Sequence, residues 1–163
     1  MDSLSAFDIL ALHPRVADLP GDWLRQLARH AWPVEHDPGH RLFRADAPAD
    51  RLWMVYTGHI RLDLYVPGRG YVEVDRCAEI VGLAALIPPY RWEFGGLVGE
   101  RFHALEFRAA GLLNLFAESP DLGCVMYARL LAAANAGLRS ARQRLTGLTT
   151  HPGPGDTGLP ARA

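Results

Sequence analysis

The stretch that decides the fold is Val81–Val98, which reads Val-Gly-Leu-Ala-Ala-Leu-Ile-Pro-Pro-Tyr-Arg-Trp-Glu-Phe-Gly-Gly-Leu-Val. Gly82 permits a tight backbone approach, and Leu83–Leu86 can form about one helical turn. Pro88 ends this turn, because the residue before a proline is kept out of the helical conformation. Free amides at a helix start attract anions, and Arg91 is close enough in sequence to clamp a phosphate. The stretch therefore predicts a pocket for a small phosphorylated ligand.

Short strands surround this stretch. Turn signals stand at Asp37-Pro38-Gly39, Thr57-Gly58 and Pro67-Gly68-Arg69-Gly70. Between Trp32 and Phe107, such signals separate runs with strand-like alternation. Examples of such runs are Arg41–Phe43, Leu52–Tyr56, Ile60–Tyr65, Tyr71–Val74 and Phe102–Phe107. Many short strands at even spacing predict an antiparallel roll or barrel.

Helical patterns precede the strands. Apolar residues recur at helical spacing from Leu4 to Ala31, with breaks at Pro14 and Pro20, which predicts two or three short helices. Asp22 is a candidate N-cap for a helix over Trp23–His30.

Helical patterns also follow the strands. A short amphipathic helix is expected over Ala109–Glu118, and Ser119-Pro120 then starts a long helix that runs from Asp121 to about Leu148. On the long helix, Cys124, Leu131, Leu138 and Leu145 recur every seventh residue, interleaved with Tyr127, Ala134, Ala141 and Leu148. This a/d pattern predicts a dimer seam of Tyr127, Leu131, Ala134, Leu138, Ala141 and Leu145. Packing on the strands explains the first half of the pattern equally well, whereas a partner helix is favoured beyond Ala141.

Composition narrows the class of protein. The chain has 163 residues and is 49% hydrophobic, so a single domain is expected. Its formal net charge of -1 argues against nucleic acid as a binding partner. The two cysteines form no CxxC pair, and no signal peptide or membrane span is apparent. A cytoplasmic location is the simplest interpretation.

The order of helices, strands, small helix and long helix resembles the cyclic nucleotide-binding domain of the Crp/Fnr type. The similar motifs are Leu19-Pro20 before Trp23-Leu24, Asp37-Pro38-Gly39-His40-Arg41-Leu42-Phe43, Asp46-Ala47-Pro48-Ala49-Asp50-Arg51-Leu52 and Val55-Tyr56-Thr57-Gly58-His59-Ile60. The resemblance implies an α+β fold: an antiparallel β-roll of the double-stranded β-helix or jelly-roll type, flanked by short N-terminal helices and a long C-terminal helix. We expect an N-terminal extension at 1–11, the domain at 12–148 and a disordered Pro/Gly tail at 149–163.

In this family the Gly82 region would be the phosphate-binding cassette, where amides and an arginine hold the phosphate and a glutamate holds the ribose. The candidate ligand-binding residues carried over are Gly82, Leu83, Ala84, Ala85, Arg91, Trp92, Phe94 and Gly95. Leu83 occupies the glutamate position, which removes a bond worth about tenfold to a hundredfold in affinity. Phe94 occupies the usual arginine position, and Arg91 lies three residues earlier.

The cassette is similar to those of small stand-alone members of the family, which carry Val-Gly-x-x-x-Leu-x-Pro-Pro-Tyr-Arg and no catalytic or DNA-binding domain. This resemblance makes Pro88-Pro89-Tyr90-Arg91 a variant cassette. The alternative is that Arg91 and Trp92 form a surface loop that packs on the roll.

Other chemistry has less support. His36 and His40 flank Pro38-Gly39 and so share no helical face, and no metal site is expected there. Haem binding has no supporting motif, and Cys77 and Cys124 are expected to be small buried groups. No catalytic residues are assigned.

The basic cluster of Arg139, Arg142 and Arg144 fits a solvated flank near the helix C-terminus as well as it fits phosphate contacts. A helix-turn-helix domain follows the long helix in the family's regulators, and here a Pro/Gly tail follows it. Direct DNA binding is therefore not expected.

Three functions remain. The leading hypothesis is a non-catalytic, homodimeric sensor that binds a cyclic nucleotide or other small anionic ligand and signals through its long helix to a regulated protein partner. The alternative is a protein–protein interaction module with a degenerate, ligand-free pocket. A DNA-binding regulator or enzyme subunit that uses the arginine-rich helix is the third.

Overall fold

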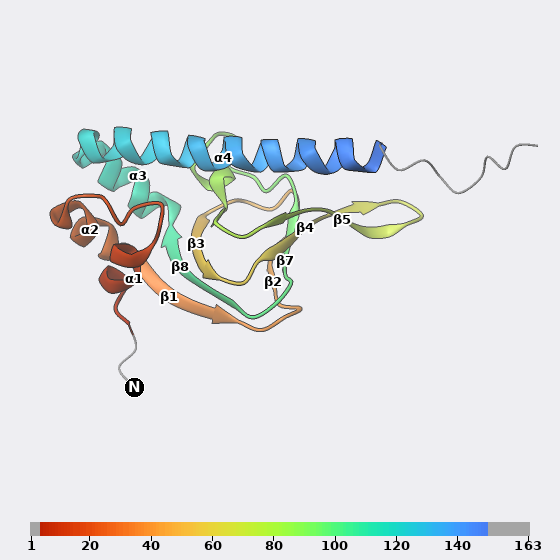
Figure 1. The fold of residues 1–163 in the computed structure, drawn as a ribbon, viewed down its shortest axis with the longest axis horizontal. Helices are drawn as coiled ribbons and strands as arrows, with labels where there is room; N and C mark the ends of the chain where they lie inside the picture. Colours follow the sequence, from red (N-terminus) through yellow and green to blue (C-terminus); the bar gives the residue numbers. More distant parts are fainter. Residues whose placement is uncertain (1–3, 150–163) are drawn as a thin grey trace, which may run out of the picture.

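The computed structural model describes residues 4–149, without the side chains of residues 145 and 147–149 (Figure 1). Two short helices, a series of short strands interrupted by a small helix, and two further helices follow one another in the order that the sequence predicts. The elements are α1 (Ala6–Leu12), α2 (Gly21–Ala28), β1 (Ala31–His36), β2 (Arg41–Phe43), β3 (Arg51–Thr57), β4 (Ile60–Val66), β5 (Gly70–Cys77), β6 (Ile80–Val81), the 3₁₀ helix η1 (Leu83–Leu86), β7 (Gly95–Val98), β8 (Phe102–Arg108), α3 (Ala109–Glu118) and α4 (Pro120–Thr149).

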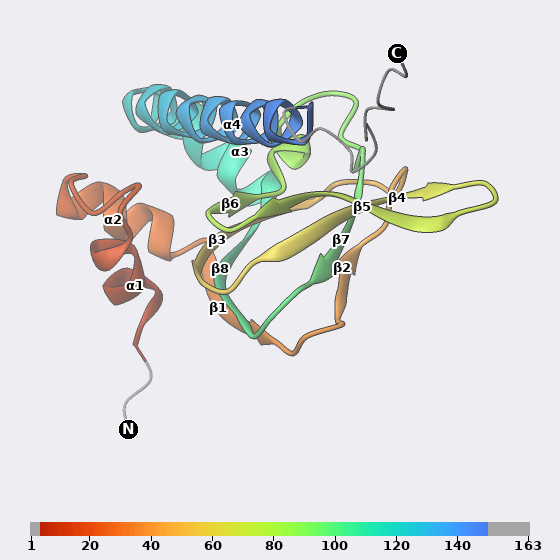
Figure 2. The ribbon, with the colours of Figure 1, turned by 45° about the vertical axis from the view of Figure 1, so that its right-hand side comes forward.

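The strands form two four-stranded antiparallel sheets, with orders β1-β8-β3-β6 and β2-β7-β4-β5. Together they make the expected α+β roll, from which the hairpin of β4 and β5 projects (Figure 2). Three of these strands, β1, β6 and β7, are absent from the predicted runs. Strand β6 has two residues, and β7 opens with Gly95-Gly96, so both lack the alternation on which the prediction relies.

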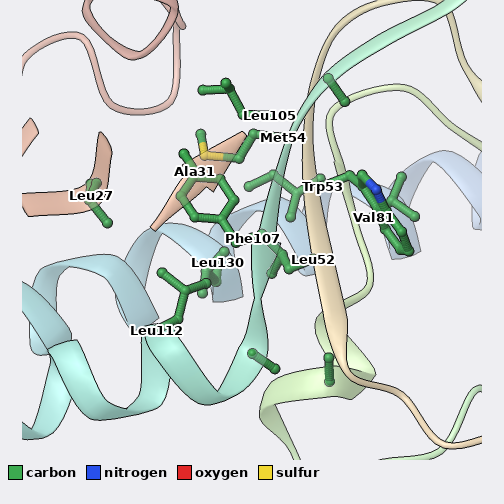
Figure 3. Packing of buried hydrophobic residues seen from close by; sticks show 14 of the residues in the cluster. Leu27, Ala31, Leu52, Trp53, Met54, Val81, Leu105, Phe107, Leu112 and Leu130 are labelled. Carbon is green, nitrogen blue, oxygen red and sulfur yellow. The ribbon is translucent and has the colours of Figure 1, made fainter. Parts of the chain in front are cut away.

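Part of the apolar core lies between the first sheet and the helices (Figure 3), and the same cluster continues into the roll through buried residues of the second sheet. Phe107 of β8 and Leu52 and Met54 of β3 are nearly inaccessible, and Leu27 of α2 and Leu112 of α3 close the core from the helical side. Each such side chain contributes about 1.5–3 kcal/mol by leaving water. The core therefore fixes the first sheet to the helices.

The N-terminal helices pack on this core. Helix α1 starts with a capping box between Ser5 and Asp8, crosses the predicted boundary at residue 12 and buries Leu10 fully. Asp22 is not the N-cap of the second helix, as the sequence suggested. Helix α2 begins at Gly21 after Pro20, and Asp22 pairs with Arg25 within the helix.

Helix α4 lies along one side of the roll, above η1 and the β4–β5 hairpin (Figures 1 and 2). Leu122, Met126 and Leu130 are buried in the part of the helix that packs on α3, whereas Leu131 and Leu138 of the predicted seam are each 71% exposed. The side chains of Leu145 and Leu148 lie outside the described residues, as does the predicted tail from residue 150 onward. Across the part of the chain that is described, no helix is both long enough and apolar enough to span a membrane.

Candidate ligand-binding cavity

The cassette packs closely against the roll at Gly82. This residue has φ +99° and caps η1, and a Cβ there would lie 2.4 Å from the Arg51 carbonyl oxygen and 3.1 Å from Leu52 Cα. Glycine is therefore required both by the left-handed backbone and by the close approach of β3. Ala85 and Leu86 of the following turn are buried, which fixes η1 against the core.

The loop after η1 turns away from the cavity. The Pro88–Pro89 peptide is cis, and Tyr90 has a positive φ of 56°. Backbone bonds join this loop to the segment 46–49: the Ala49 amide donates to the Tyr90 carbonyl at 2.8 Å, and the Trp92 amide donates to the Ala47 carbonyl at 3.0 Å. Arg91 is exposed, and its guanidinium donates to the Asp46 carbonyl.

A cavity of about 440 Å³ lies between the cassette, the second sheet and α4. Apolar and small residues make up most of its walls. The lining residues are Phe43, Leu62, Asp75, Cys77, Ile80, Val81, Gly82, Leu83, Ala84, Trp92, Glu93, Phe94, Ala134, Gly137, Leu138 and Ala141.

An aromatic stack forms one wall of this cavity. The rings of Phe43 and Trp92 have centroids 4.1 Å apart, and Trp53 stacks on both from the core side. The Trp53 indole donates to Glu106 at 2.9 Å, and Trp92 is 5% exposed. The three rings therefore form a tightly packed aromatic cluster at the border of the cavity.

The charged groups around the cavity are acidic or already paired. Asp75 and Glu93 are the charged residues among those that line it. Asp75 forms an ion pair with Arg144 of α4, which joins the helix to the β4–β5 hairpin. The Cys77 thiol donates to the Ile80 carbonyl at 3.0 Å, and burial raises the pKa of this thiol.

The structure gathers five of the eight predicted ligand-binding residues around the cavity. Gly82, Leu83, Ala84, Trp92 and Phe94 line it, whereas Ala85 is buried beside it and Arg91 is directed elsewhere.

Gly95, which was also predicted to bind the ligand, is not among the residues that line the cavity. A Cβ there would lie 2.2 Å from Asp63 Oδ1 and 2.6 Å from Arg41 Nη1. These two groups form a half-buried ion pair at 2.7 Å, and the Asp63 carboxylate raises the pKa of Arg41 above its usual value. Gly95 thus makes room for a structural ion pair.

Part of the predicted dimer seam also meets the cavity. Ala134, Leu138 and Ala141 line it from α4, together with Gly137. A second, fully apolar hollow of about 270 Å³ lies one to two turns earlier, lined by Leu83, Leu86, Ile87, Tyr127, Leu130, Leu131 and Ala134. Residues of the predicted seam thus line two hollows that both border the cassette, and Leu83 and Ala134 line both of them.

Sequence reasoning missed the cavity residues from distant strands. Phe43 and Cys77 lie on β2 and β5, and only the roll topology brings them to the cassette. Gly137 could have been noticed in the sequence. A glycine within a helix costs about 1 kcal/mol relative to alanine, so its presence in a predicted helix needs an explanation.

The remaining sequence candidates are placed apart from the cavity. The His36 and His40 rings stack with centroids 4.2 Å apart, and burial lowers the pKa of His36. Within residues 4–149, no three His, Cys, Asp or Glu side chains come together as a metal site. Of the arginine cluster on α4, Arg144 is engaged by Asp75, and Arg139 and Arg142 are exposed.

Comparison with solved structures identifies the fold as that of the cyclic nucleotide-binding domain of the Crp/Fnr type. The chain is similar to a Geobacter metallireducens protein named for cyclic nucleotide binding (TM-score 0.71, 22% identity, 83% of this chain and 99% of that one). It is also similar to a cyclic nucleotide-binding domain from Methylobacillus flagellatus (TM-score 0.73, 19% identity, 91% and 84%).

A third similar structure is the catabolite activator protein of Thermus thermophilus (TM-score 0.62, 18% identity, 83% and 63%). No family model and no curated protein matches the chain. These structural similarities show the common fold alone.

Proposed function

We propose that this chain is a non-catalytic regulatory module that holds a small molecule between its cassette and α4 and signals through that helix. The observation that carries the proposal is that α4 forms one wall of the cavity and is tied to the hairpin by the Arg144–Asp75 ion pair. A molecule that fills the cavity contacts residues on both sides of this gap. It therefore has unequal affinity for different positions of α4, as ligand-driven signalling requires.

The nucleotide-like or other anionic ligand expected from the sequence is the first to test. Leu83 at the acid position offers no partner to a ribose hydroxyl, and Arg91 donates to a backbone carbonyl outside the cavity. We expect cyclic AMP and cyclic GMP to bind weakly, with dissociation constants in the millimolar range. Calorimetry decides this: micromolar binding that Arg91→Ala abolishes would restore the sequence-based assignment of Arg91.

The ion pair between Arg144 and Asp75 provides a test of whether ligand binding is coupled to helix α4. Arg144→Gln frees the helix from the hairpin without changing a residue that lines the cavity. We expect it to change the affinity for any ligand of the cavity by about threefold or more, whereas Arg139→Gln, on the same helix, leaves affinity unchanged. Equal affinities in all three proteins would contradict signalling through α4.

We also propose that the chain forms a homodimer through the exposed face of α4. Tyr127 is 44% exposed, and Leu131 and Leu138 are exposed still further. Large apolar groups at such spacing on one helix are typical of a helix–helix interface. Light scattering at tens of micromolar should give a dimer that Leu131→Asp converts to a monomer, whereas a monomeric parent protein would count against the seam.

The same exposed residues favour the second candidate function, an interaction module whose pocket is empty. The two functions differ in what the cavity does. If filling the cavity from within, by Gly137→Leu, leaves partner binding unchanged, the interaction module is favoured. If it changes partner binding, the cavity is part of the signal.

A further inference from the structure

None of the described residues that line the cavity is an arginine or lysine that could hold a phosphate. The charged lining residues are Asp75 and Glu93, and Asp75 is paired with Arg144 of α4. Two other arginines near the cassette are likewise engaged, Arg91 by the Asp46 carbonyl and Arg51 by Glu106 at 2.6 Å. An anion in this cavity would lose its hydration and would face a carboxylate, so the electrostatics disfavour it.

The walls favour an apolar ring instead. The mutually stacked rings of Phe43 and Trp92 border the cavity, and Phe94 is half-buried beside the cassette. Leu62 and Ile80 add aliphatic surface from β4 and β6. A cavity of about 440 Å³ falls within the range of about 300–1,000 Å³ that is usual for small-molecule sites. Offset stacking on an aromatic wall orients a flat ligand without any charged contact.

Helix α4 leaves space above this wall. A Cβ built on Gly137 would meet nothing within 4 Å, although Gly137 is one of the residues that line the cavity. Ala134 and Ala141, about one turn before and after it, are also small. The space is therefore bounded on one side by small helical residues and on the other by aromatic rings.

We propose that the ligand of this cavity is a neutral, apolar, ring-containing molecule that stacks on the Phe43–Trp92 wall beneath Gly137. This inference rests on the proposed function for its site, and it replaces the phosphorylated ligand with an uncharged one. Glu93 at the cavity repels negatively charged ligands of the same size.

A matched pair of fluorescent probes tests the charge preference. N-phenylnaphthylamine is neutral, and anilinonaphthalenesulfonate carries the same aromatic frame with one added sulfonate. We expect the full chain to bind the neutral dye at least about tenfold more tightly than the anionic dye. Glu93→Arg places a cation at the cavity and should reduce this ratio by about threefold or more. Equal or tighter binding of the anionic dye to the parent protein would overturn the proposal.

Variants of α4 test where the neutral dye binds. Gly137→Leu fills the cavity from the helix and should abolish binding, and Ala141→Leu does so from the next turn if the first variant fails to fold. Ala132→Leu adds the same side chain at an exposed position outside the cavity and should leave binding unchanged. Binding that survives both cavity variants places the dye elsewhere and overturns the proposal.

The outcomes separate this inference from the proposed function. If the neutral dye binds in the cavity and Arg144→Gln leaves its affinity unchanged, the ligand class stands and signalling through α4 fails. If only the anionic dye binds, and Arg144→Gln alters its affinity, the regulatory function stands and the ligand class fails. If neither dye binds, the proposal of an apolar ligand is wrong.

Discussion

The two halves of α4 differ in how they contact the rest of the domain. The anchored half, residues 120–131, buries Leu122, Met126 and Leu130, and its Arg129 donates to the Arg15 carbonyl and to both carboxylate oxygens of Asp18. The cavity half, residues 134–144, presents small residues to an open space and reaches the hairpin through Arg144. One continuous helix thus combines a fixed support with the cavity wall that, as we propose, a ligand moves.

The largest expected effect comes from truncating one apolar residue in each half. Met126→Ala removes a side chain that is 4% exposed and should lower the free energy of unfolding by about 3 kcal/mol through lost burial and a cavity. Leu138→Ala removes a side chain that is 71% exposed and should lower it by less than about 0.5 kcal/mol. Urea denaturation at low protein concentration, where self-association does not contribute, measures both. Similar losses would erase the difference between the halves.

Alanine substitutions at two glycines of α4, one in each half of the helix, should have opposite effects on stability. A Cβ at Gly123 would lie 2.9 Å from Phe116 Cβ, so Gly123→Ala should destabilise the protein by about 1–2 kcal/mol through overpacking. Gly137 has open space, so Gly137→Ala should stabilise it by about 0.5–1 kcal/mol through helix propensity. Thermal unfolding of both variants provides the measurement. Destabilisation by Gly137→Ala would show that the cavity half is packed after all.

The support beneath the anchored half should depend on pH. His13 is 4% exposed, its Nε2 lies 3.1 Å from the Val55 carbonyl, and its Nδ1 accepts from the Arg15 amide. Burial lowers the pKa of His13 below its ordinary value of 6.5, so the folded protein binds fewer protons than the unfolded chain just below that pH. The stability that neutral His13 contributes is present above pH 6.5 and is lost as the pH falls below it.

Replacing His13 isolates its contribution to the pH dependence of stability. We expect the free energy of unfolding to fall by up to about 1 kcal/mol per pH unit more steeply in the parent protein than in His13→Gln, over the range below pH 6.5. The same comparison in a His36→Gln background removes the contribution of His36 on β1, because burial lowers the pKa of that residue as well. Parallel pH curves for the parent and His13→Gln would contradict this role.

The smallest expected effect is at the ion pair of the cavity half. Asp75 and Arg144 have side chains that are 26% and 45% exposed, so solvent screens their attraction. Asp75→Asn should change the free energy of unfolding by less than about 1 kcal/mol and should loosen the cavity half without affecting the anchored half. A large loss of stability would mean that the pair supports the fold itself.

The sequence predicted the order of the elements and the position of the cassette, because these depend on local signals. Pro88 ended the small helix, Gly82 marked a tight backbone approach, and Ser119-Pro120 marked the start of α4. The composition of the cavity could not be predicted in this way. Phe43 and Cys77 reach it only through the strand order of the second sheet.

The placement of Arg91 also depended on contacts that are distant in sequence. Its loop bonds to the segment 46–49, some forty residues earlier, and this pairing carries the guanidinium to Asp46. Arg91 therefore lies in a loop that packs on the roll, which was the alternative to a ligand-binding cassette. Trp92 also packs in the roll, and it lines the cavity as well.

Hydrogen exchange of the α4 amides tests the central claim most directly. Without ligand, amides of residues 134–144 should exchange at least about tenfold faster than those of residues 122–130, because few buried contacts hold the cavity half. Saturation with the neutral dye should slow the cavity half alone, and Gly137→Leu should remove that effect. Uniform protection along the helix, unchanged by the dye, would contradict the division of α4 into a support and a movable wall.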